Sequence, residues 1–309
     1  MAVKKNGIIV LGAVFVDIKG FPDDIYIPTG KNAGRVKYVH GGVSRNVVED
    51  IANIELRPTF LGIVDDSAIG ADVKSKLERH KVNTSYMQQV PDGMGTWLAV
   101  FDNNGDVAGS ISQRPDLSPV LTILEEKGDE IFSEADSVVM EVDMDKEIVK
   151  KVIKLCKKYD IKLYGVVSNM RIVLERRDLL QQFDCFICNQ LEAGQFFSED
   201  YSEKTPDTLK TILADSLKRA NIPSMVVTMG EDGAVYADIN GNCGICPAQK
   251  VQVKDTTGAG DAFCAGVAIG LTYGKGLSDA VEIGTRLAAS VITSSENVCP
   301  RFLPAEFGL

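Results

Sequence analysis

The chain has 309 residues and a mass of 33.4 kDa, and 45% of its residues are hydrophobic, which is ordinary for a soluble globular protein with one large core. Its 43 acidic and 33 basic residues give a formal net charge of −10 and a sequence pI of about 4.9. This charge repels a phosphate backbone and an anionic lipid surface. We therefore expect neither nucleic acid nor a membrane as a partner.

The first residues imitate a secretion signal, because two lysines precede the apolar run Gly7–Val16. However, Asp17 and Pro22 follow where a cleavage site should have small residues, and no apolar run approaches the roughly 18 residues that span a membrane. We expect a buried first strand over Ile8–Val16 and a cytoplasmic protein.

Seven cysteines are scattered along the chain without the spacing of a disulfide framework, which fits a reducing compartment. Two Cys-x-x-Cys pairs, Cys185/Cys188 and Cys243/Cys246, invite a zinc interpretation, but they lie much further apart than the roughly 15–20 residues of a zinc ribbon. Cys185 and Cys188 also fall in a strand-like run, where positions i and i+3 point to opposite faces. We expect small buried hydrophobic side chains and no zinc.

Apolar runs rich in β-branched residues alternate with helical patterns along the chain. This alternation predicts an α/β fold of three layers, with a mostly parallel sheet and helices on both faces. The strand-like runs are Ile8–Val16, Ser137–Glu141, Ile161–Val167, Cys185–Cys188 and Ser224–Thr228. Apolar residues at helical spacing predict helices over Asp145–Tyr159 and Leu277–Val291.

Two segments break the alternation. Residues 24–40 contain two short strand-like pieces, Ile25–Ile27 and Arg35–Val39, and residues 96–112 form a hairpin pattern. We expect both segments to be inserted as a small β-sheet lid that covers a site. Since no internal repeat or long linker divides the chain, residues 1–309 are predicted to form a single domain with this lid.

The most informative stretch is Asp255-Thr-Thr-Gly-Ala-Gly-Asp261, which follows the strand-like Val251–Val253 and opens a helical run. Gly258 and Gly260 would let backbone N–H groups converge at a helix N-terminus and form an anion hole. Asp261, in the first helical turn, could then accept the proton of a hydroxyl that attacks a phosphoryl group. The local alternative is a tight turn with an acid favoured by the helix dipole. No P-loop or dinucleotide fingerprint competes with this interpretation.

Four motifs resemble, in the same order, those of the ribokinase-like (PfkB) carbohydrate and nucleoside kinases. They are Gly41-Gly42-Val-Ser-Arg-Asn46, Asn189-Gln-Leu-Glu192, Thr228-Met-Gly230-Glu-Asp-Gly233 and Asp255-Thr-Thr-Gly258-Ala-Gly-Asp261. The resemblance covers nearly the whole chain and implies a ribokinase-like fold. It also implies an ATP-dependent kinase that transfers the γ-phosphoryl group to a primary hydroxyl of a sugar or nucleoside.

The resemblance implies a role for each candidate residue. Asp261 would be the catalytic base, beside an anion hole formed by Gly258, Ala259 and Gly260. The nucleotide site would involve Asn189, Glu192, Thr228, Gly230, Gly233, Thr257 and, near the adenine, Asn297. Glu192 would help to hold Mg²⁺, and Asp255 and Thr257 stand where many relatives bind a monovalent cation such as K⁺. The substrate would lie under the lid near Asp17, Gly41, Gly42, Asn46 and Glu141.

Residues 34–46 and 228–241 look closer to pseudouridine kinases than to ribokinases or fructokinases, so a pseudouridine-like nucleoside is favoured. Phe15 departs from the Asn that relatives carry two positions before Asp17, and Gly165-Val166 replaces an acid-Pro pair of the pseudouridine enzymes. A free-sugar kinase for ribose or a hexose and a non-catalytic, sugar-binding regulatory member of the family stay open as alternatives. Besides the small-molecule substrate, we expect a second copy of the chain as a partner, in a homodimer through the β-lid.

Overall fold

The β-branched apolar runs form a central sheet of eight strands, in the order β14-β13-β12-β11-β10-β9-β1-β4. The structure is a computed structural model that describes residues 3–309. The strands are β1 (Ile8–Leu11), β4 (Thr59–Leu61), β9 (Ser137–Glu141), β10 (Lys162–Val166), β11 (Cys185–Asn189), β12 (Ser224–Thr228), β13 (Ala234–Asp238) and β14 (Cys243–Cys246). The pairs β12–β13 and β13–β14 are antiparallel, and the remaining pairs are parallel. The predicted mostly parallel sheet is therefore confirmed.

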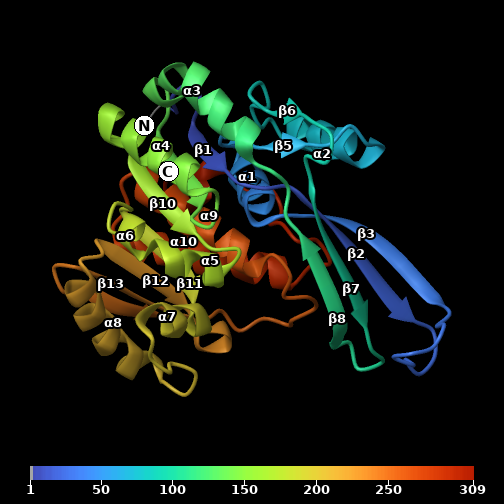
Figure 1. Cartoon of the computed structure of the whole chain (residues 1–309). Coiled ribbons are helices and arrows are strands. Elements are labelled where there is room, and N and C mark those ends of the chain that lie inside the picture. Colours follow the sequence, from blue (N-terminus) through green and yellow to red (C-terminus); the bar gives the residue numbers. More distant parts are fainter. Residues whose placement is uncertain (1–2) are drawn as a thin grey trace.

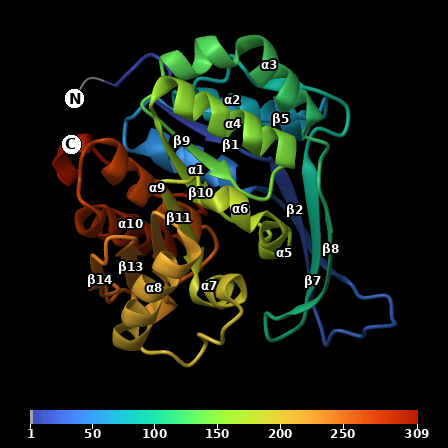
Figure 2. The ribbon, with the colours of Figure 1, turned by 60° about the vertical axis from the view of Figure 1, so that its left-hand side comes forward.

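Helices cover both faces of this sheet (Figures 1 and 2). One face packs on α3 (Ser118–Ser133), α4 (Lys146–Tyr159), α5 (Met170–Val173), α6 (Arg177–Leu180), α7 (Gln190–Phe197) and α8 (Pro206–Ala220). The other packs on α1 (Val43–Asn53), α2 (Ala68–Arg79), α9 (Ala259–Thr272) and α10 (Leu277–Ile292). Two cores arise because successive residues of a strand point to opposite faces. Thus Ile9 and Leu11 of β1 lie in one core, and Ile8 and Val10 lie in the other.

The Cys185/Cys188 pair follows the same rule. Cys188 packs in the core on the α8 side, whereas Cys185 packs in the core on the α9 side, so the two thiols point away from each other. Both are buried. In β14, Cys243 is exposed and Cys246 is buried. The geometry predicted for the first pair is confirmed.

The lid is a separate sheet of four strands in the order β3-β2-β7-β8, and it projects from one end of the body (Figure 1). Its strands are β2 (Phe15–Pro22), β3 (Gly34–Gly41), β7 (Gly95–Phe101) and β8 (Val107–Gln113). The hairpin predicted over residues 96–112 and the piece Arg35–Val39 are thus confirmed as lid strands. A further pair, β5 (Ile63–Val64) with β6 (Gln88–Gln89), lies beside α2.

Two strand predictions for the N-terminal region are wrong. The run Ile8–Val16 is not one strand, because the chain leaves the central sheet after Leu11 and starts the lid strand β2 at Phe15. Gly12 lies at this break, where a side chain would collide with Ser44. The piece Ile25–Ile27 belongs to the turn between β2 and β3, and its two isoleucines are exposed.

In the part of the chain that the structure describes, no helix has the length and apolar character needed to cross a bilayer.

Candidate active site

A glycine turn places a carboxylate at the N-terminus of α9. Gly258 is the N-cap with a φ of 83°, and a Cβ atom there would lie 2.0 Å from the backbone oxygen of Asn297. Only glycine fits this position. The N–H groups of the first turn that follows, including those of Gly260 and Asp261, lack partners within the helix. The N–H of Ala259 donates to the carbonyl of Thr256 over 3.2 Å. The turn therefore offers the donors of an anion hole, with that of Ala259 partly engaged.

Asp261 is the third residue of α9 and is half-buried. Its Oδ2 atom accepts a hydrogen bond from Nδ2 of Asn46 in α1 over 2.6 Å. Burial raises the pKa of Asp261 to about 7, although the Asn46 hydrogen bond and the charge of Arg45 lower it; nearby Asp17 raises it further. A pKa near neutrality suits a general base.

Asn297 supports this contact from behind. Its Nδ2 atom donates to Oδ1 of Asn46 over 3.2 Å and to the backbone oxygen of His40 over 3.0 Å. Asn297 is absent from the residues that line the large cleft described below. The structure therefore places Asn297 next to Asn46, which contacts Asp261, and outside the lining of this cleft.

The Gly-Gly motif connects the lid to α1. Gly42 is the N-cap of α1 with a φ of 99°, and a Cβ atom there would lie 2.5 Å from the backbone oxygen of Ala13. A Cβ atom on Gly41 would lie 2.6 Å from Oδ1 of Asp17, so this carboxylate rests directly against the motif. Burial raises the pKa of Asp17, and the charges of Lys19 and Arg45 partly offset this shift. The structure thus brings Asp17, Gly41, Gly42, Asn46 and Asp261 together at the base of the lid.

Glu141, which was expected near the substrate, lies at the end of β9, and only 1% of the residue is exposed. Its Oε1 atom accepts hydrogen bonds from the N–H groups of Ala13 over 3.3 Å and Ser44 over 3.1 Å, and Oε2 has no partner among the described residues. Burial and the charge of Asp143 raise the pKa of Glu141 to about 7. Glu141 therefore connects the segment after β1 to the start of α1.

Asn189 and Glu192 form a capping box at the start of α7. Oδ1 of Asn189 accepts from the N–H of Glu192, and Oε2 of Glu192 accepts from the N–H of Asn189, both over 2.8 Å. Burial and the charge of Asp143 raise the pKa of Glu192 against the effect of the Asn189 hydrogen bond. The Oε1 atom of Glu192 takes no part in the box. A carboxylate oxygen near a second acid suits Mg²⁺, which usually takes one or two carboxylates and fills its other positions with water and phosphate oxygens.

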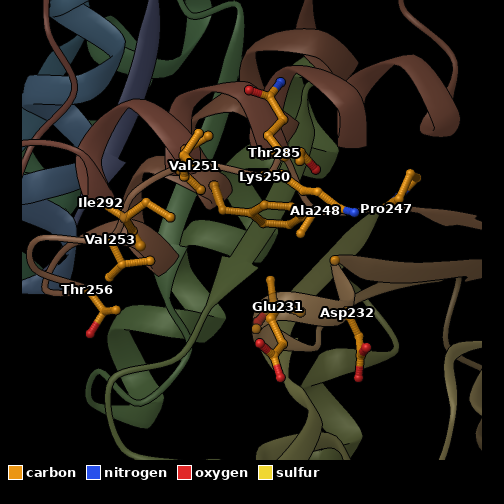
Figure 3. A pocket seen from close by; sticks show the side chains of 18 of the residues that line it. Glu231, Asp232, Pro247, Ala248, Lys250, Val251, Val253, Thr256, Thr285 and Ile292 are labelled. Carbon is orange, nitrogen blue, oxygen red and sulfur yellow. The ribbon is translucent and has the colours of Figure 1, made fainter.

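A cleft of about 1270 Å³ lies between the 228–233 turn, the 247–253 segment, α9 and α10 (Figure 3). It is lined by Thr228, Gly230 and Gly233, as predicted for the nucleotide site, and it reaches Ala259 and Gly260 at the anion hole. The strand predicted over Val251–Val253 is wrong, because this segment pairs with no strand and forms a wall of the cleft. Val253 is 58% exposed although it is apolar.

Asp255 and Thr257 lie in the exposed loop before α9. Oδ1 of Asp255 accepts from the N–H of Thr257 over 2.8 Å. Burial alone would raise the pKa of Asp255, but the hydrogen bonds from Thr257 and the charge of Lys19 bring it below its usual value. Thr256 lines the cleft, whereas Thr257 is absent from the lining residues. An ionised, accessible carboxylate fits the expected cation, although no group of three or more His, Cys, Asp or Glu residues within residues 3–309 would hold a metal by itself.

Sequence reasoning missed two arginines. Arg45 is almost fully buried, donates to the backbone oxygen of His40 and pairs with Glu49 over 2.6 Å. Its charge lowers the pKa values of Asp17 and Asp261. The position of Arg45 inside the Gly-Gly motif could have indicated this role. Arg114, just after β8, pairs with the buried carboxylate of Asp143 over 2.5 Å and so fastens the lid to the end of β9. No sequence pattern indicated that pair.

Comparison with known proteins agrees with this geometry. A family model described as pfkB family carbohydrate kinase matches residues 5–299. The guanosine-inosine kinase of Exiguobacterium acetylicum is 35% identical over 303 residues, which cover 97% of this chain and 99% of the relative. The pseudouridine kinase of Escherichia coli (strain K12) is 25% identical over 268 residues, or 86% and 83% of the two chains. The structure of Arabidopsis thaliana ribokinase complexed with ribose and ATP matches at a TM-score of 0.83 with 18% identity and 99% coverage of each chain. The chain therefore belongs to the pfkB family of carbohydrate kinases.

Proposed function

We propose that this kinase transfers the γ-phosphoryl group of ATP to a primary hydroxyl of a nucleoside. The observation that carries this proposal is the position of Asp261. Its carboxylate, with a pKa of about 7, lies beside the open N–H groups of α9 on one side and is bonded to Asn46 on the other. A carboxylate there would accept the proton of the substrate hydroxyl while the helix N-terminus stabilises the phosphoryl oxygens.

The cleft supports ATP as the phosphoryl donor. The accessible apolar side chains of Val251 and Val253 would pack on the flat adenine (Figure 3). Ala259 and Gly260 of the glycine turn also line the cleft, and their N–H groups would face the phosphates. Glu192 would hold a Mg²⁺ ion, which neutralises phosphate charge when it is bound. Asp255 would hold a monovalent cation such as K⁺ close to the anion hole.

Guanosine or inosine stands first among the substrates that we propose, and pseudouridine second. Two relatives are named as nucleoside kinases, and the guanosine-inosine kinase shares more of its sequence with this chain over a longer alignment than the pseudouridine kinase does. This order replaces the pseudouridine preference drawn from the sequence. The likeness to ribokinase, at 18% identity, supports the fold alone. The second candidate function is a free-sugar kinase that acts on ribose or a hexose, because the match to a family of carbohydrate kinases favours it.

The test is a comparison of kcat/KM, which reports differential transition-state binding, for guanosine, inosine, pseudouridine, uridine, adenosine, ribose and fructose. We expect the highest values for guanosine and inosine. A preference for ribose or fructose would replace the nucleoside by a free sugar and leave the kinase assignment intact. Failure to phosphorylate any of the seven compounds, in protein that binds ATP, would favour the non-catalytic alternative.

A further inference from the structure

One face of the lid sheet looks toward the substrate side of the active site. Asp17 lies on this face, because its carboxylate rests against Gly41 and its charge raises the pKa of Asp261. Trp97 is the register partner of Asp17 in the parallel pair β2–β7. Since residues paired across a sheet point to the same side, the Trp97 indole stands next to Asp17 on the face that covers the substrate.

Trp97 begins an aromatic wall that continues along the lid. Its ring meets Phe101 edge-on, with centroids 6.4 Å apart and planes at 89°. Phe101 in turn stacks on Phe21, with centroids 4.8 Å apart and planes at 14°. All three side chains are half-buried, and alternation along β2 and β7 puts them on the face that carries Asp17. The wall starts at the sugar-side carboxylate and extends toward the tip of the lid.

Neighbouring side chains leave part of the Trp97 indole accessible. The Nζ atom of Lys19 lies 5.9 Å from the Trp97 ring centroid, so a charged, hydrated group reaches the ring. The same ammonium lowers the pKa values of Asp17 and Asp255, so Lys19 has acidic partners near it when it leaves the ring. A flat ligand can therefore take its place over the indole.

A free sugar has no flat aromatic surface that could stack on these side chains. A pentose presents hydroxyl groups all round, and these need the polar partners that Asp17 and Asn46 supply. A nucleobase has a broad π-face, and stacking on an aromatic side chain is the common way in which proteins hold it. In a ribonucleoside the base and the 5′-carbon leave the ribose ring on opposite sides of the ring oxygen. A ribose with its 5′-hydroxyl at Asp261 therefore extends its base away from α9.

We propose that Trp97 is a specificity-determining residue, whose indole stacks on the base of a nucleoside while Asp17 holds the ribose. This inference rests on the proposed function and names the group that separates a nucleoside from a free sugar. Phe101 and Phe21 position the indole by packing behind it. Lys19 moves from the ring toward Asp17 and Asp255 when the base binds.

Trp97 is the only tryptophan of the chain, so intrinsic tryptophan fluorescence reports on this residue alone. The first experiment titrates the wild-type protein with inosine, guanosine and ribose in the absence of ATP. We expect saturable quenching by both nucleosides and an unchanged signal with ribose. Inosine that binds, as shown by calorimetry, without any change in fluorescence would overturn the proposal.

The second experiment compares variants by steady-state kinetics. Trp97→Ala should raise KM for inosine and guanosine by about 5- to 140-fold, the factor that corresponds to the stacking of one base, while kcat and the KM for ATP change little. Trp97→Phe keeps an aromatic face and should recover most of the affinity. The matched control is Leu98→Ala, because Leu98 is the next residue of β7 and points to the opposite face of the sheet.

The outcomes separate the two proposals. If wild-type protein phosphorylates inosine but Trp97→Ala behaves like Leu98→Ala, the role of Trp97 is refuted and the nucleoside kinase function stands. If nucleosides quench the fluorescence but are not phosphorylated, Trp97 recognises the base and the proposed function is wrong. Should Trp97→Ala not fold, the wild-type titration and Trp97→Phe still decide the question.

Discussion

Asn46 and Asp261 are 215 residues apart in the chain, yet the Asn46 amide donates to the Asp261 carboxylate over 2.6 Å. This bond joins the first turn of α1, which follows the Gly-Gly motif, to the first turn of α9, which follows the glycine turn. The two glycine-containing motifs therefore meet at one carboxylate, and the side chains that shift its pKa, Asn46, Arg45 and Asp17, come from α1 and the lid.

Removing that carboxylate tests its role directly. Asp261→Asn keeps the shape of the side chain and should keep the fold and ATP binding, but it cannot accept a proton. We expect kcat to fall by about 10²–10⁴-fold, the usual loss for a general base. Thermal unfolding with and without an ATP analogue provides the control for folding and binding. A folded variant with near-wild-type kcat would remove Asp261 from the mechanism.

The pH profile tests the environment of the same group. Because the base is active when it is ionised, kcat/KM, which reports the free enzyme, should rise as the pH rises through about 7 and then level off. The Asn46 hydrogen bond lowers the pKa of Asp261, so Asn46→Ala should move the midpoint to higher pH. Weaker substrate binding alone would change KM without moving this midpoint. An unchanged midpoint would contradict the coupling between these two residues.

The two glycines of the turn should differ sharply in their tolerance of a methyl group. At Gly258 the left-handed conformation costs about 1–2 kcal/mol for another residue, and the clash with the Asn297 carbonyl adds about 1–3 kcal/mol. We therefore expect Gly258→Ala to lower the free energy of unfolding by more than about 2 kcal/mol. Gly260→Ala is the matched control, since its Cβ atom would meet nothing within 4 Å. Equal stability of the two variants in denaturant unfolding would refute this account of the turn.

The residue types alone predicted much of the fold, and they pointed to Asp17, Asn46 and Asp261, which the structure brings together at the base of the lid. The alternation of strand-like and helical runs predicts the three layers, and glycine-rich turns at helix starts indicate where backbone N–H groups lack hydrogen-bond partners. The run Ile8–Val16 was misassigned because Leu11 and Val16 are both buried, so hydrophobicity does not reveal that the chain changes sheet between them. The strand predicted over Ile25–Ile27 was wrong for the opposite reason, since the β-branched residues there are exposed in a turn.

Side-chain partners from separate elements could not be predicted. The bond from Asn297 to Asn46 depends on how the segment after α10 passes the Gly-Gly motif. The place of Trp97 beside Asp17 depends on the register of two lid strands, and a shift of one residue would turn the indole to the other face.

The loop carboxylate Asp255 predicts a response to monovalent cations. We expect kcat to rise when K⁺ replaces a large organic cation at constant ionic strength, which keeps general screening equal. Asp255→Asn should abolish the difference between the two salts. Asp200→Asn is the matched control, because Asp200 makes the same carboxylate bond to the backbone N–H two residues later, in the loop after α7. Equal rates in both salts for the wild-type protein would count against a cation at Asp255.

The outer face of the lid predicts the oligomeric state. Tyr38, Ile18, Leu98 and Ile111 are register partners in turn across the four lid strands, so they form one apolar row on the face opposite to Asp17. Tyr38 is 63% exposed and Ile111 is 69% exposed. A row of this kind on a sheet with two open edges is costly to leave in water, and a second lid would cover it. We therefore expect a homodimer through the lid.

Light scattering after size exclusion would measure this mass directly. Ile111→Asp places a charge at the end of the row, on the edge strand β8, and should shift the protein from twice the chain mass toward 33.4 kDa. Leu191→Asp is the matched control, because Leu191 is equally apolar and 64% exposed but lies on α7, away from the lid. The dimer would leave the site-facing side of each lid free, so Ile111→Asp should not alter the fluorescence response of Trp97 to a nucleoside. A wild-type protein that stays at the mass of one chain over a wide concentration range would refute the dimer, and the apolar row would then need another occupant.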